Sequence, residues 1–570
     1  MGFGSLGMRM IRVRLGAIAL VMGTWVSGFG SGSVIAQVPP PVDAQNHWAR
    51  GCLTAMKDRG WLVGDGSGRV YPQQVMGQRD FATLVKRAWG AKARSLSVSQ
   101  NAPLTRGAAF TILARSLGLL DRGDPRANVL VAQTYTDAAA IPAAQRSGVA
   151  AVTRKGWGLI YPSSRQFRAG TVLSRGEAAA LICQSLSDRL ESPATNTLQS
   201  LVVRVPEVRG VWLTTVDSDV LYDRTVMEGA LAQLAQFNFN TVYPVVWHNG
   251  DTLFPSETFR RATGRAMSNH PRLRGRDLMR ELSAAGKKHG LTVIPWLEFG
   301  MMVAPESAIA QQHPDWLSQR ANGTNTTHAG AEQRAWLNPT HPEVQKFLTD
   351  LAVEIVQKYP VAGIQWDDHF GWPADFGYSP TTIAAYRKDF PGQSPPTSSQ
   401  DPRWARWQNW RRDRLSQLFA RISKGVKQAR PDAIVSLSPN PYHFANPHSL
   451  QDWAWWVRSG WVDEIIVQVY RNDMERFQQQ LGDRTLQTAS AQVPVSIGLL
   501  SGLRAKPVPS LTLGQQVREV RDRELNGMAF FFYETLWNLT DETPEQRQWA
   551  IRRWFFNPAP RPLLIQRSAL

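Results

Sequence analysis

The sequence contains very little cysteine: Cys52 and Cys183 are the only two among 570 residues. Their spacing fits no zinc-binding motif, and the chain has neither an H-E-x-x-H pattern nor a Walker-type phosphate loop. We therefore expect no metal ion and no other cofactor. In an oxidising compartment the two cysteines could form a disulfide, and two separate buried thiols are the alternative.

Long hydrophobic runs are also scarce, because no segment after the N-terminal region is long and apolar enough to cross a bilayer. The N-terminal region has Arg9, Arg12 and Arg14 before an apolar stretch at residues 15–26, followed by small residues up to Ala36. This order is typical of a secretory signal, so we expect residues 1–36 to be removed on export. An uncleaved membrane anchor is the alternative. The mature chain is then expected to be exported to the periplasm or cell envelope, without a membrane span.

Acidic residues are outnumbered, with 46 Asp and Glu against 64 Lys and Arg, which gives a net charge of +18. An excess of positive charge favours anionic surroundings such as cell-wall polymer, lipid headgroups or nucleic acid. The basic residues are scattered, and no arginine-rich run is interleaved with aromatic residues, so we expect no nucleic-acid partner. These features leave the oligomeric state open.

An internal repeat occupies the first part of the mature chain. Its first unit has a predicted helix at residues 49–59, a glycine-rich turn, the corner Tyr71-Pro72 and a second helix. The same order returns between Tyr135 and residue 190, with the corner Tyr161-Pro162. A shorter middle unit is represented by one helix that ends near residue 117.

These repeats resemble the S-layer homology (SLH) domain over residues 43–190, through the aromatic-proline corners and the Thr/Ser-Arg-Gly helix starts. The resemblance implies an all-α domain that attaches the protein to cell-wall polysaccharide or peptidoglycan through Arg79, Arg106 and Arg175. A helix N-terminus beside a guanidinium also suits an anion. The alternative is that each arginine pairs locally at its helix start.

Beyond Pro206, eight β-type runs alternate with amphipathic helices, which predicts a (β/α)8 TIM barrel over residues 206–540. The predicted strands are 210–215, 240–247, 291–297, 362–366, 433–438, 464–470, 493–499 and 527–533. A doubly wound sheet is the alternative, but no glycine-rich phosphate loop supports it. The fold class is therefore α/β, a TIM barrel with an N-terminal all-α domain, and residues 541–570 form a C-terminal helix and tail.

Functional residues of a TIM barrel stand at the carboxyl ends of its strands. Here those ends are rich in carboxylates, amides and aromatic rings, which suit a sugar polymer because rings stack on pyranose faces. Residues 363–370 are the richest segment, with two adjacent acids and a histidine after an apolar run. The predicted substrate-binding residues are Trp212, Asp217, Tyr243, His248, Asp251, Trp296, His369, Asn440, Gln468, Tyr470, Glu534 and Trp537.

The predicted catalytic residues are Asp367, Asp368 and Glu298, because paired carboxylates flank a glycosidic bond in hydrolases. Period-two alternation places Gln365, Asp367 and His369 on the side facing the barrel mouth, which ranks Asp367 above Asp368. One of the two aspartates could instead be structural, and Glu298 could form a buried salt bridge. His369 is expected to orient a neighbour by a hydrogen bond rather than to act as a base.

Three tryptophans, Trp404, Trp407 and Trp410, recur at helical spacing and are expected to pack rather than to bind sugar.

Four segments resemble the glycosyl-hydrolase-like family 10: residues 208–213, 240–243, 250–256 and 363–369. The resemblance spans residues 206–540 and implies a barrel that cleaves bacterial glycans, with some relatives linked to peptide-free peptidoglycan strands. We therefore expect an exported glycoside hydrolase, tethered to the wall, that acts first on peptidoglycan. The alternatives are a catalytically silent glycan-binding or envelope-tethering protein and an exopolysaccharide hydrolase.

Overall fold

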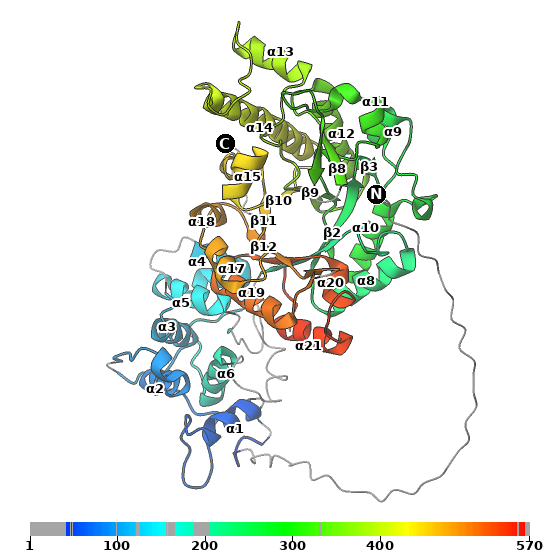
Figure 1. The fold of residues 1–570 in the computed structure, drawn as a ribbon. Helices are drawn as coiled ribbons and strands as arrows, with labels where there is room; N and C mark the ends of the chain where they lie inside the picture. The colour runs from blue at the N-terminus through cyan, green and yellow to red at the C-terminus, as the bar shows by residue number, and fades with distance from the viewer. Residues whose placement is uncertain are drawn as a thin grey trace, which may run out of the picture. The chain divides into compact units, whose positions relative to one another are not determined.

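The computed structural model describes residues 41–564, except 46, 48, 99, 121–125, 156, 158–165, 187–205, 330–331, 505 and 556–557 (Figure 1). The predicted signal at residues 1–36 and the corner Tyr161-Pro162 lie outside the described residues. Within the described ranges, no helix is both long and apolar enough to cross a membrane.

The N-terminal module is helical, as the repeats predict. Its helices are α1 Arg50–Asp58, α2 Gln78–Trp89, η1 Gly90–Lys92, α3 Arg106–Ser116, α4 Arg126–Thr134, η2 Ala138–Ala140, α5 Ala143–Arg154 and α6 Arg175–Ser185. Thr105 and Ser174 cap α3 and α6 by accepting backbone N–H bonds. The predicted Thr/Ser-Arg-Gly helix starts are confirmed for these two helices, because a hydroxyl at the N-cap satisfies a free N–H group.

A ring of backbone hydrogen bonds joins the three repeats. Met76 donates to Leu173 at 2.9 Å, Leu173 donates to Leu104 at 2.8 Å, and Leu104 donates to Met76 at 2.8 Å. Cys52 and Cys183 form a disulfide between α1 and α6, with Cα atoms 5.9 Å apart. The first and last helices are therefore neighbours, and the three repeats close into one unit.

The three arginines at the helix starts also link the repeats in a cycle, with donors and acceptors in the opposite order to the backbone ring. Arg79 donates to the carbonyl of Val98 at 3.4 Å, Arg106 to Phe167 at 2.9 Å and Arg175 to Val70 at 2.9 Å. Arg106 is only 2% exposed and also pairs with Glu177. The prediction that Arg106 contacts wall polymer is wrong, since its guanidinium is buried against a loop far away in the sequence.

The barrel consists of eight parallel strand positions and is closed. Its strands are β1 Val208–Leu213, β2 Thr241–His248, β4 Thr292–Val293 with β5 Trp296–Leu297, β9 Gly363–Asp367, β10 Ile434–Ser438, β11 Glu464–Gln468, β12 Val495–Leu500 and β15 Gly527–Phe531. They follow the order β1-β15-β12-β11-β10-β9-β5-β2, and β2 pairs with β1 to close the circle. The third predicted strand is interrupted at Pro295, which has no N–H group for the ladder.

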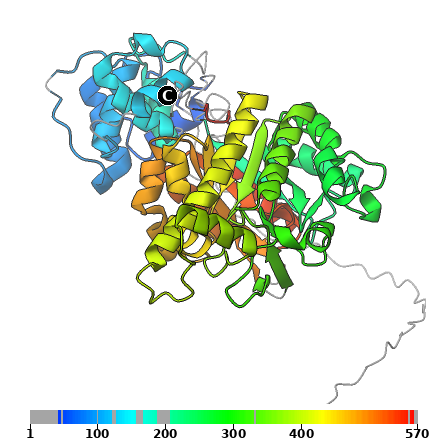
Figure 2. The same cartoon turned by 90° about the horizontal axis from the view of Figure 1, so that it is seen from above.

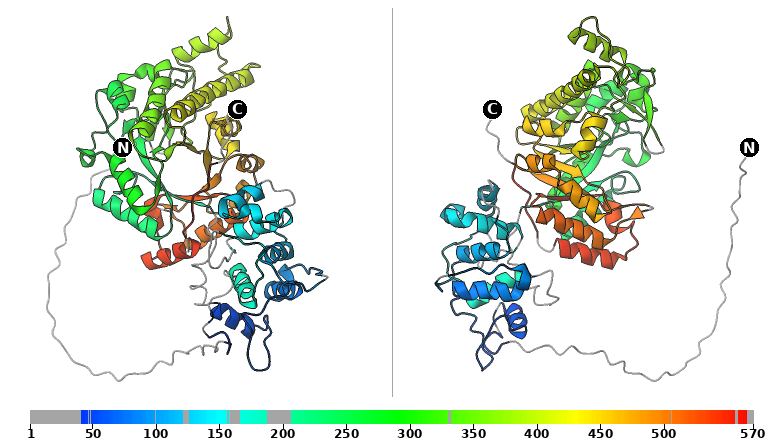
Figure 3. Two further views of the ribbon diagram at one scale, coloured as in Figure 1. Left: turned by 180° about the vertical axis from the view of Figure 1, so that it is seen from behind. Right: turned by 60° about the vertical axis from the view of Figure 1, so that its left-hand side comes forward.

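Helices surround this barrel on the outside (Figures 1 and 3). They include α8 Arg224–Gln236, α10 Leu278–His289, α12 Pro342–Lys358, α14 Trp404–Ala429, α16 Trp453–Arg458, α17 Met474–Leu481, α18 Arg484–Ser490, α19 Ser510–Asp522 and α21 Pro544–Trp554. The long α14 packs beside α12 (Figure 2). Smaller elements lie in the connections: β3 Asp251–Thr252, α9 Glu257–Thr263, η3 Pro271–Leu273, β6 Met302–Val303, α11 Ala308–Gln312, η4 Pro314–Trp316, β7 Thr326–Ala329, β8 Glu332–Trp336, α13 Pro380–Asp389, α15 Tyr442–Ser449, β13 Gly502–Leu503, β14 Lys506–Pro507 and α20 Tyr533–Trp537.

The predicted facing of β9 is confirmed for its middle residues. Gln365 lies inside the barrel, where it accepts from the indole of Trp212 at 2.8 Å. Trp366 faces the helices instead and packs against Phe370, which contacts Phe419 of α14.

The expectation that the tryptophans of α14 pack is confirmed as well. The rings of Trp407 and Trp410 stack with centroids 5.4 Å apart, and Trp404 packs against the same cluster.

The amino-terminal end of the barrel is closed by the chain that follows α21. Arg561 forms an ion pair with Glu464 at the start of β11 and donates to Thr241 at the start of β2. The carbonyl of Ala559 accepts from Asn240 at 2.9 Å, which fixes the segment across the strand starts. Glu464 is buried and the side chain of Arg561 is only 13% exposed, so Glu464 depends on Arg561 for neutralisation.

Arg561→Met should lower the free energy of unfolding by about 3–5 kcal/mol, because Glu464 would remain buried without its cation. Chemical denaturation followed by tryptophan fluorescence measures this loss. Arg224→Met, at the exposed start of α8, is the control and should change stability by less than about 0.5 kcal/mol. Replacing Glu464 by Met as well should restore most of the loss, whereas an unchanged deficit in the double variant would contradict the assignment.

Candidate active site

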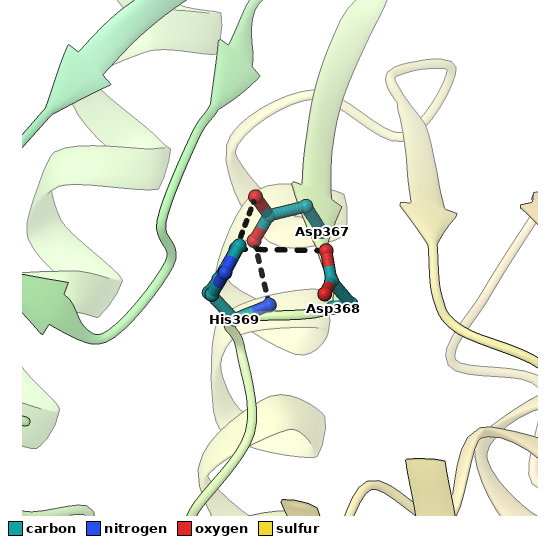
Figure 4. A group of neighbouring side chains, drawn as sticks. All are labelled: Asp367, Asp368 and His369. Atoms are coloured by element: carbon teal, nitrogen blue, oxygen red, sulfur yellow. Dashed lines mark hydrogen bonds and ion pairs between the residues drawn. The ribbon is translucent and has the colours of Figure 1, made fainter. Parts of the chain in front are cut away.

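The end of β9 brings Asp367, Asp368 and His369 together at the barrel mouth (Figure 4). Nδ1 of His369 lies 3.2 Å from Oδ2 of Asp367 and 3.5 Å from Oδ1 of Asp368. Within the described part of the chain, no other group of three His, Cys, Asp or Glu has donor atoms as close as 4.8 Å. All four carboxylate oxygens accept hydrogen bonds from protein donors, so no metal ion is needed to satisfy them.

Asp367 is fixed by backbone donors. Its Oδ2 accepts from the N–H of Phe299 at 2.9 Å, and its Oδ1 accepts from the N–H of His369 at 3.0 Å. Phe299 reaches this position with φ of +65°, a conformation that costs a bulky side chain about 1–3 kcal/mol. The following Gly300 is equally constrained, because a Cβ there would lie 2.4 Å from the backbone N of Phe370. The ends of β5 and β9 are thus locked together around one carboxylate.

Asp368 extends across the barrel mouth rather than away from it. Its oxygens accept from Asn440 after β10 at 2.8 Å and from Gln468 of β11 at 2.9 Å. Its side chain is 18% exposed, compared with 1% for Asp367. Asp368 therefore reaches further into the mouth than the strand alternation indicates, because the alternation ends with the strand and the chain then turns Asp368 into the mouth.

The pKa values of Asp368 and His369 are shifted by their surroundings. Burial raises the pKa of Asp368, and Asp367 raises it further, while His369 and the bond from Gln468 lower it. Burial lowers the pKa of His369, but Asp368, Asp367 and Glu298 outweigh burial and raise that pKa to about 9. His369 is therefore an imidazolium at neutral pH, enclosed by carboxylates.

Glu298 is tied to a different histidine. Its Oε2 accepts from Nδ1 of His248 at 2.6 Å, while Asn249 lies against the other ring nitrogen at 2.8 Å. Because Glu298 is almost fully buried, the structure favours the buried-pair alternative over a proton donor. The catalytic role of Glu298 stays a prediction.

Several predicted substrate-binding aromatics belong to the core. Trp212 and Tyr243 are buried inside the barrel, where the hydroxyl of Tyr243 contacts Glu464 at the opposite end from the site. The ring of Trp296, also buried, packs edge-on against the ring of Trp212, with centroids 6.4 Å apart. Trp537 packs against Phe237 on the helix side. A TIM barrel is filled by side chains, so inward aromatics at these depths pack rather than bind.

Three predicted acids are engaged by neighbours. Asp217 pairs with Arg504 at 2.5 Å, and Asp251 pairs with Arg265 at 2.7 Å. Glu534 lies on α20 and accepts from Ser218 at 2.9 Å. None of these three acids has a described hydrogen bond or ion pair with Asp367 or Asp368. The predicted substrate-binding residues that remain near the centre of the site, besides His369, are His248, Asn440, Gln468 and Tyr470.

Phe299 and Arg334 are site residues that the sequence did not single out. The half-buried ring of Phe299 lies 4.9 Å from the ring of His248 and 5.0 Å from that of His369. Arg334 of β8 stacks on the same ring at 5.2 Å. Phe299 directly follows the acid at a strand end and could have been found by that position. Arg334 comes from an inserted sheet and carries no such signal.

Comparison with known proteins agrees with this architecture. The family model described as "Glycosyl hydrolase-like 10" matches residues 207–518. The chain belongs to the glycosyl hydrolase-like 10 family. The family and the barrel together support a glycan hydrolase.

Two named relatives illustrate the similarity. The chain is 26% identical to "Glycosyl hydrolase DigH" of Escherichia coli K12 over 336 residues, which cover 51% of this chain and 73% of that protein. It is 24% identical to "Glycosyl hydrolase YngK" of Bacillus subtilis 168 over 177 residues, or 28% of this chain and 31% of that protein. Among solved structures, the glycoside hydrolase domain of PgaB (BpsB) from Bordetella bronchiseptica superposes with a TM-score of 0.46 at 15% identity, covering 57% of this chain and 94% of that domain.

The raised pKa of His369 predicts a pH-dependent stability. Because the folded pKa is about 9 and the ordinary value is 6.5, this stabilisation is complete below pH 6.5 and is lost as pH rises through about 9. Between these pH values the wild type should lose on the order of 1–3 kcal/mol of unfolding free energy that His369→Gln does not lose. Denaturant unfolding at a series of pH values measures how the unfolding free energy changes with pH in the wild type and in His369→Gln. His443→Gln, at an exposed position, should follow the wild type, and identical slopes in all three proteins would contradict the assignment.

Proposed function

We propose that this protein is an exported glycoside hydrolase that cleaves a β-linked, N-acetylated glycan of the bacterial cell wall, with peptidoglycan strands as the first candidate. The pair Asp367 and Asp368 at the centre of the barrel mouth carries the proposal. Two carboxylates in one mouth, fixed by different donors, can take different roles in breaking a glycosidic bond.

The rim around the pair is suited to a sugar. Amides at Asn440 and Gln468 can exchange hydrogen bonds with hydroxyl groups, and the rings of Phe299 and Tyr470 offer apolar faces beside the acids. The rings of Tyr470 and Phe531 stack at 5.6 Å, which holds Tyr470 in place above the barrel core. Family membership supports hydrolysis as the reaction, and both relatives are named as glycosyl hydrolases.

The acetamido group enters the proposal through the adjacency of the two acids. In substrate assistance, one carboxylate orients the 2-acetamido group, whose oxygen attacks the anomeric carbon. In covalent catalysis, a carboxylate attacks that carbon directly. Substrates without the acetamido group separate the two schemes: they should be inert in the first and cleaved in the second.

The N-terminal module completes the proposal as a wall anchor. Its three linked repeats resemble an SLH domain over residues 43–190, and the chain carries a net charge of +18, which favours anionic polymer. With residues 1–36 as a secretory signal, the enzyme would act in the periplasm or cell envelope. A silent glycan-binding protein or an exopolysaccharide hydrolase remain the competing functions that the experiments below distinguish.

The chain without residues 1–36 should release soluble muro-oligosaccharides from peptidoglycan stripped of its stem peptides. Asp367→Asn and Asp368→Asn should each lower kcat by about 10²–10⁴-fold, since each removes a charge at the reaction centre and keeps the shape. Chromatography of the released sugars measures this, with Asp432→Asn at an exposed position as control. Binding without product would support the silent protein, and product only from partly deacetylated poly-N-acetylglucosamine would support the exopolysaccharide hydrolase.

Deletion of residues 43–190 should reduce co-sedimentation with intact sacculi by at least about tenfold, because several weak contacts to one polymer act together. Hydrolysis of short soluble oligosaccharides should remain close to that of the full chain. Equal co-sedimentation of the two proteins would show that the barrel binds sacculi without the N-terminal module.

A further inference from the structure

We propose that His369, held in place by Asp367, is the proton donor and acceptor of the reaction, while Asp368 acts at the anomeric carbon. The inference rests on the proposed function and adds a catalytic residue to it. Asp367 then becomes a positioning residue rather than the group that touches substrate.

The geometry of the three side chains supports this division. Asp367 is 1% exposed, and its oxygens are occupied by two backbone N–H groups and by Nδ1 of His369. The side chain of His369 is 30% exposed. Its Nε2 bonds to no other described residue and is not shut off from solvent. A histidine that acts as a general acid or base is commonly oriented in this way. One ring nitrogen is bonded to a buried carboxylate, and the other is free to exchange a proton with the substrate.

Asp368 is a poor proton donor, although burial raises its pKa. Both oxygens accept N–H bonds from side-chain amides, and such bonds are stronger to the ionised carboxylate than to the protonated acid. The amide orientation of Gln468 is fixed independently, because the same Nε2 also donates to the carbonyl of Ser438 at 2.9 Å. Asp368 is therefore held as an acceptor, which suits a carboxylate that stabilises or attacks a positive carbon.

The other acids near the mouth have other partners. Glu298 is buried against His248, and Glu534 accepts from Ser218 and Asn538. Asp217 and Asp251 form ion pairs with arginines. Among the described residues of the mouth, His369 is the group that carries a proton and has an unoccupied ring nitrogen.

The reaction balances with these groups. The Nε2–H of His369 passes its proton to the glycosidic oxygen as the bond from that oxygen to C1 breaks, and the bond pair stays on the leaving oxygen. C1 then forms a bond to a carboxylate oxygen of Asp368, or to the acetamido oxygen that Asp368 orients. Water then attacks C1, the bond from C1 to that oxygen breaks with its electron pair returning to the oxygen, and the water gives a proton to the neutral Nε2, which restores the imidazolium.

The charges that face His369 keep it protonated before the reaction. Asp367 and Asp368 face it from its own segment, and Glu298 faces it from the end of β5. Arg334 stacks on the ring of Phe299, which itself packs against His369. Tyr470, just after β11, lies near the same three carboxylates. The three acids outweigh the single arginine, in agreement with the raised pKa of about 9.

The leaving group tests the proposal in the chain that lacks residues 1–36. His369→Gln should lower kcat/KM by about 10²–10⁴-fold on denuded peptidoglycan strands. On a dinitrophenyl β-glycoside of an N-acetylglucosamine disaccharide the loss should stay below about tenfold, because that leaving group needs no proton. Asp368→Asn should lower kcat/KM by the same factor on both substrates. The control His443→Gln should have the kcat/KM of the wild type on both.

The pH profile gives a second readout that a structural role would not move. In the wild type, kcat/KM on denuded strands should fall above pH about 9. Asp367→Asn should move this basic limb toward pH 6.5, since the imidazolium loses its nearest anion. This variant keeps the proposal testable if His369→Gln fails to fold, which near-ultraviolet circular dichroism detects.

Equal losses of His369→Gln on both substrates, or an unmoved basic limb in Asp367→Asn, would overturn the assignment of His369. A wild type that cleaves neither substrate would instead overturn the proposed function, and the inference with it.

Discussion

The hydrogen bond from the backbone N–H of Phe299 to Asp367 is the contact on which the site depends. It joins the end of β5 to the end of β9, and it forms because Phe299 adopts a left-handed conformation. Gly300 permits the turn to lie against Phe370, where any side chain would collide with the backbone. The fixed carboxylate then sets the position of His369. A strained turn on one strand thus determines the orientation of a histidine on the next.

Like charges are tolerated at the mouth because each carboxylate has its own set of donors. Asp367 receives two backbone N–H groups, Asp368 receives two amides, and Glu298 receives the imidazole of His248. Bonds from neutral donors stabilise an anion without adding a second permanent charge. The net negative charge of the cluster therefore persists, and it is available to hold a proton on His369.

The periodic parts of the fold were predictable from the sequence. The barrel strands are apolar runs bounded by turns, so their positions agree with the structure within a few residues. Alternation also placed Gln365 inside and Trp366 outside. These predictions succeed because burial on a strand or helix repeats at a fixed spacing.

The site was harder to predict, because its key features break that spacing. Asp368 turns into the mouth after the ladder ends, and the bond from Phe299 depends on a conformation that its sequence does not favour. Trp212 and Tyr243 were misassigned because an aromatic in a barrel core and one on a rim look alike in sequence. Arg106 was misassigned because its partner, the carbonyl of Phe167, is distant in the chain.

The two ends of the barrel each contain a buried carboxylate paired with a cation, but the two cations differ in whether they can release a proton. At the amino-terminal end, buried Glu464 is neutralised by Arg561, whose guanidinium keeps its proton under all physiological conditions. At the carboxyl end, buried Asp367 faces His369, whose proton can leave and return. Burial makes both anions dependent on a partner. Of the two cations, only the imidazolium can release a proton near neutral pH, as the proposed reaction requires.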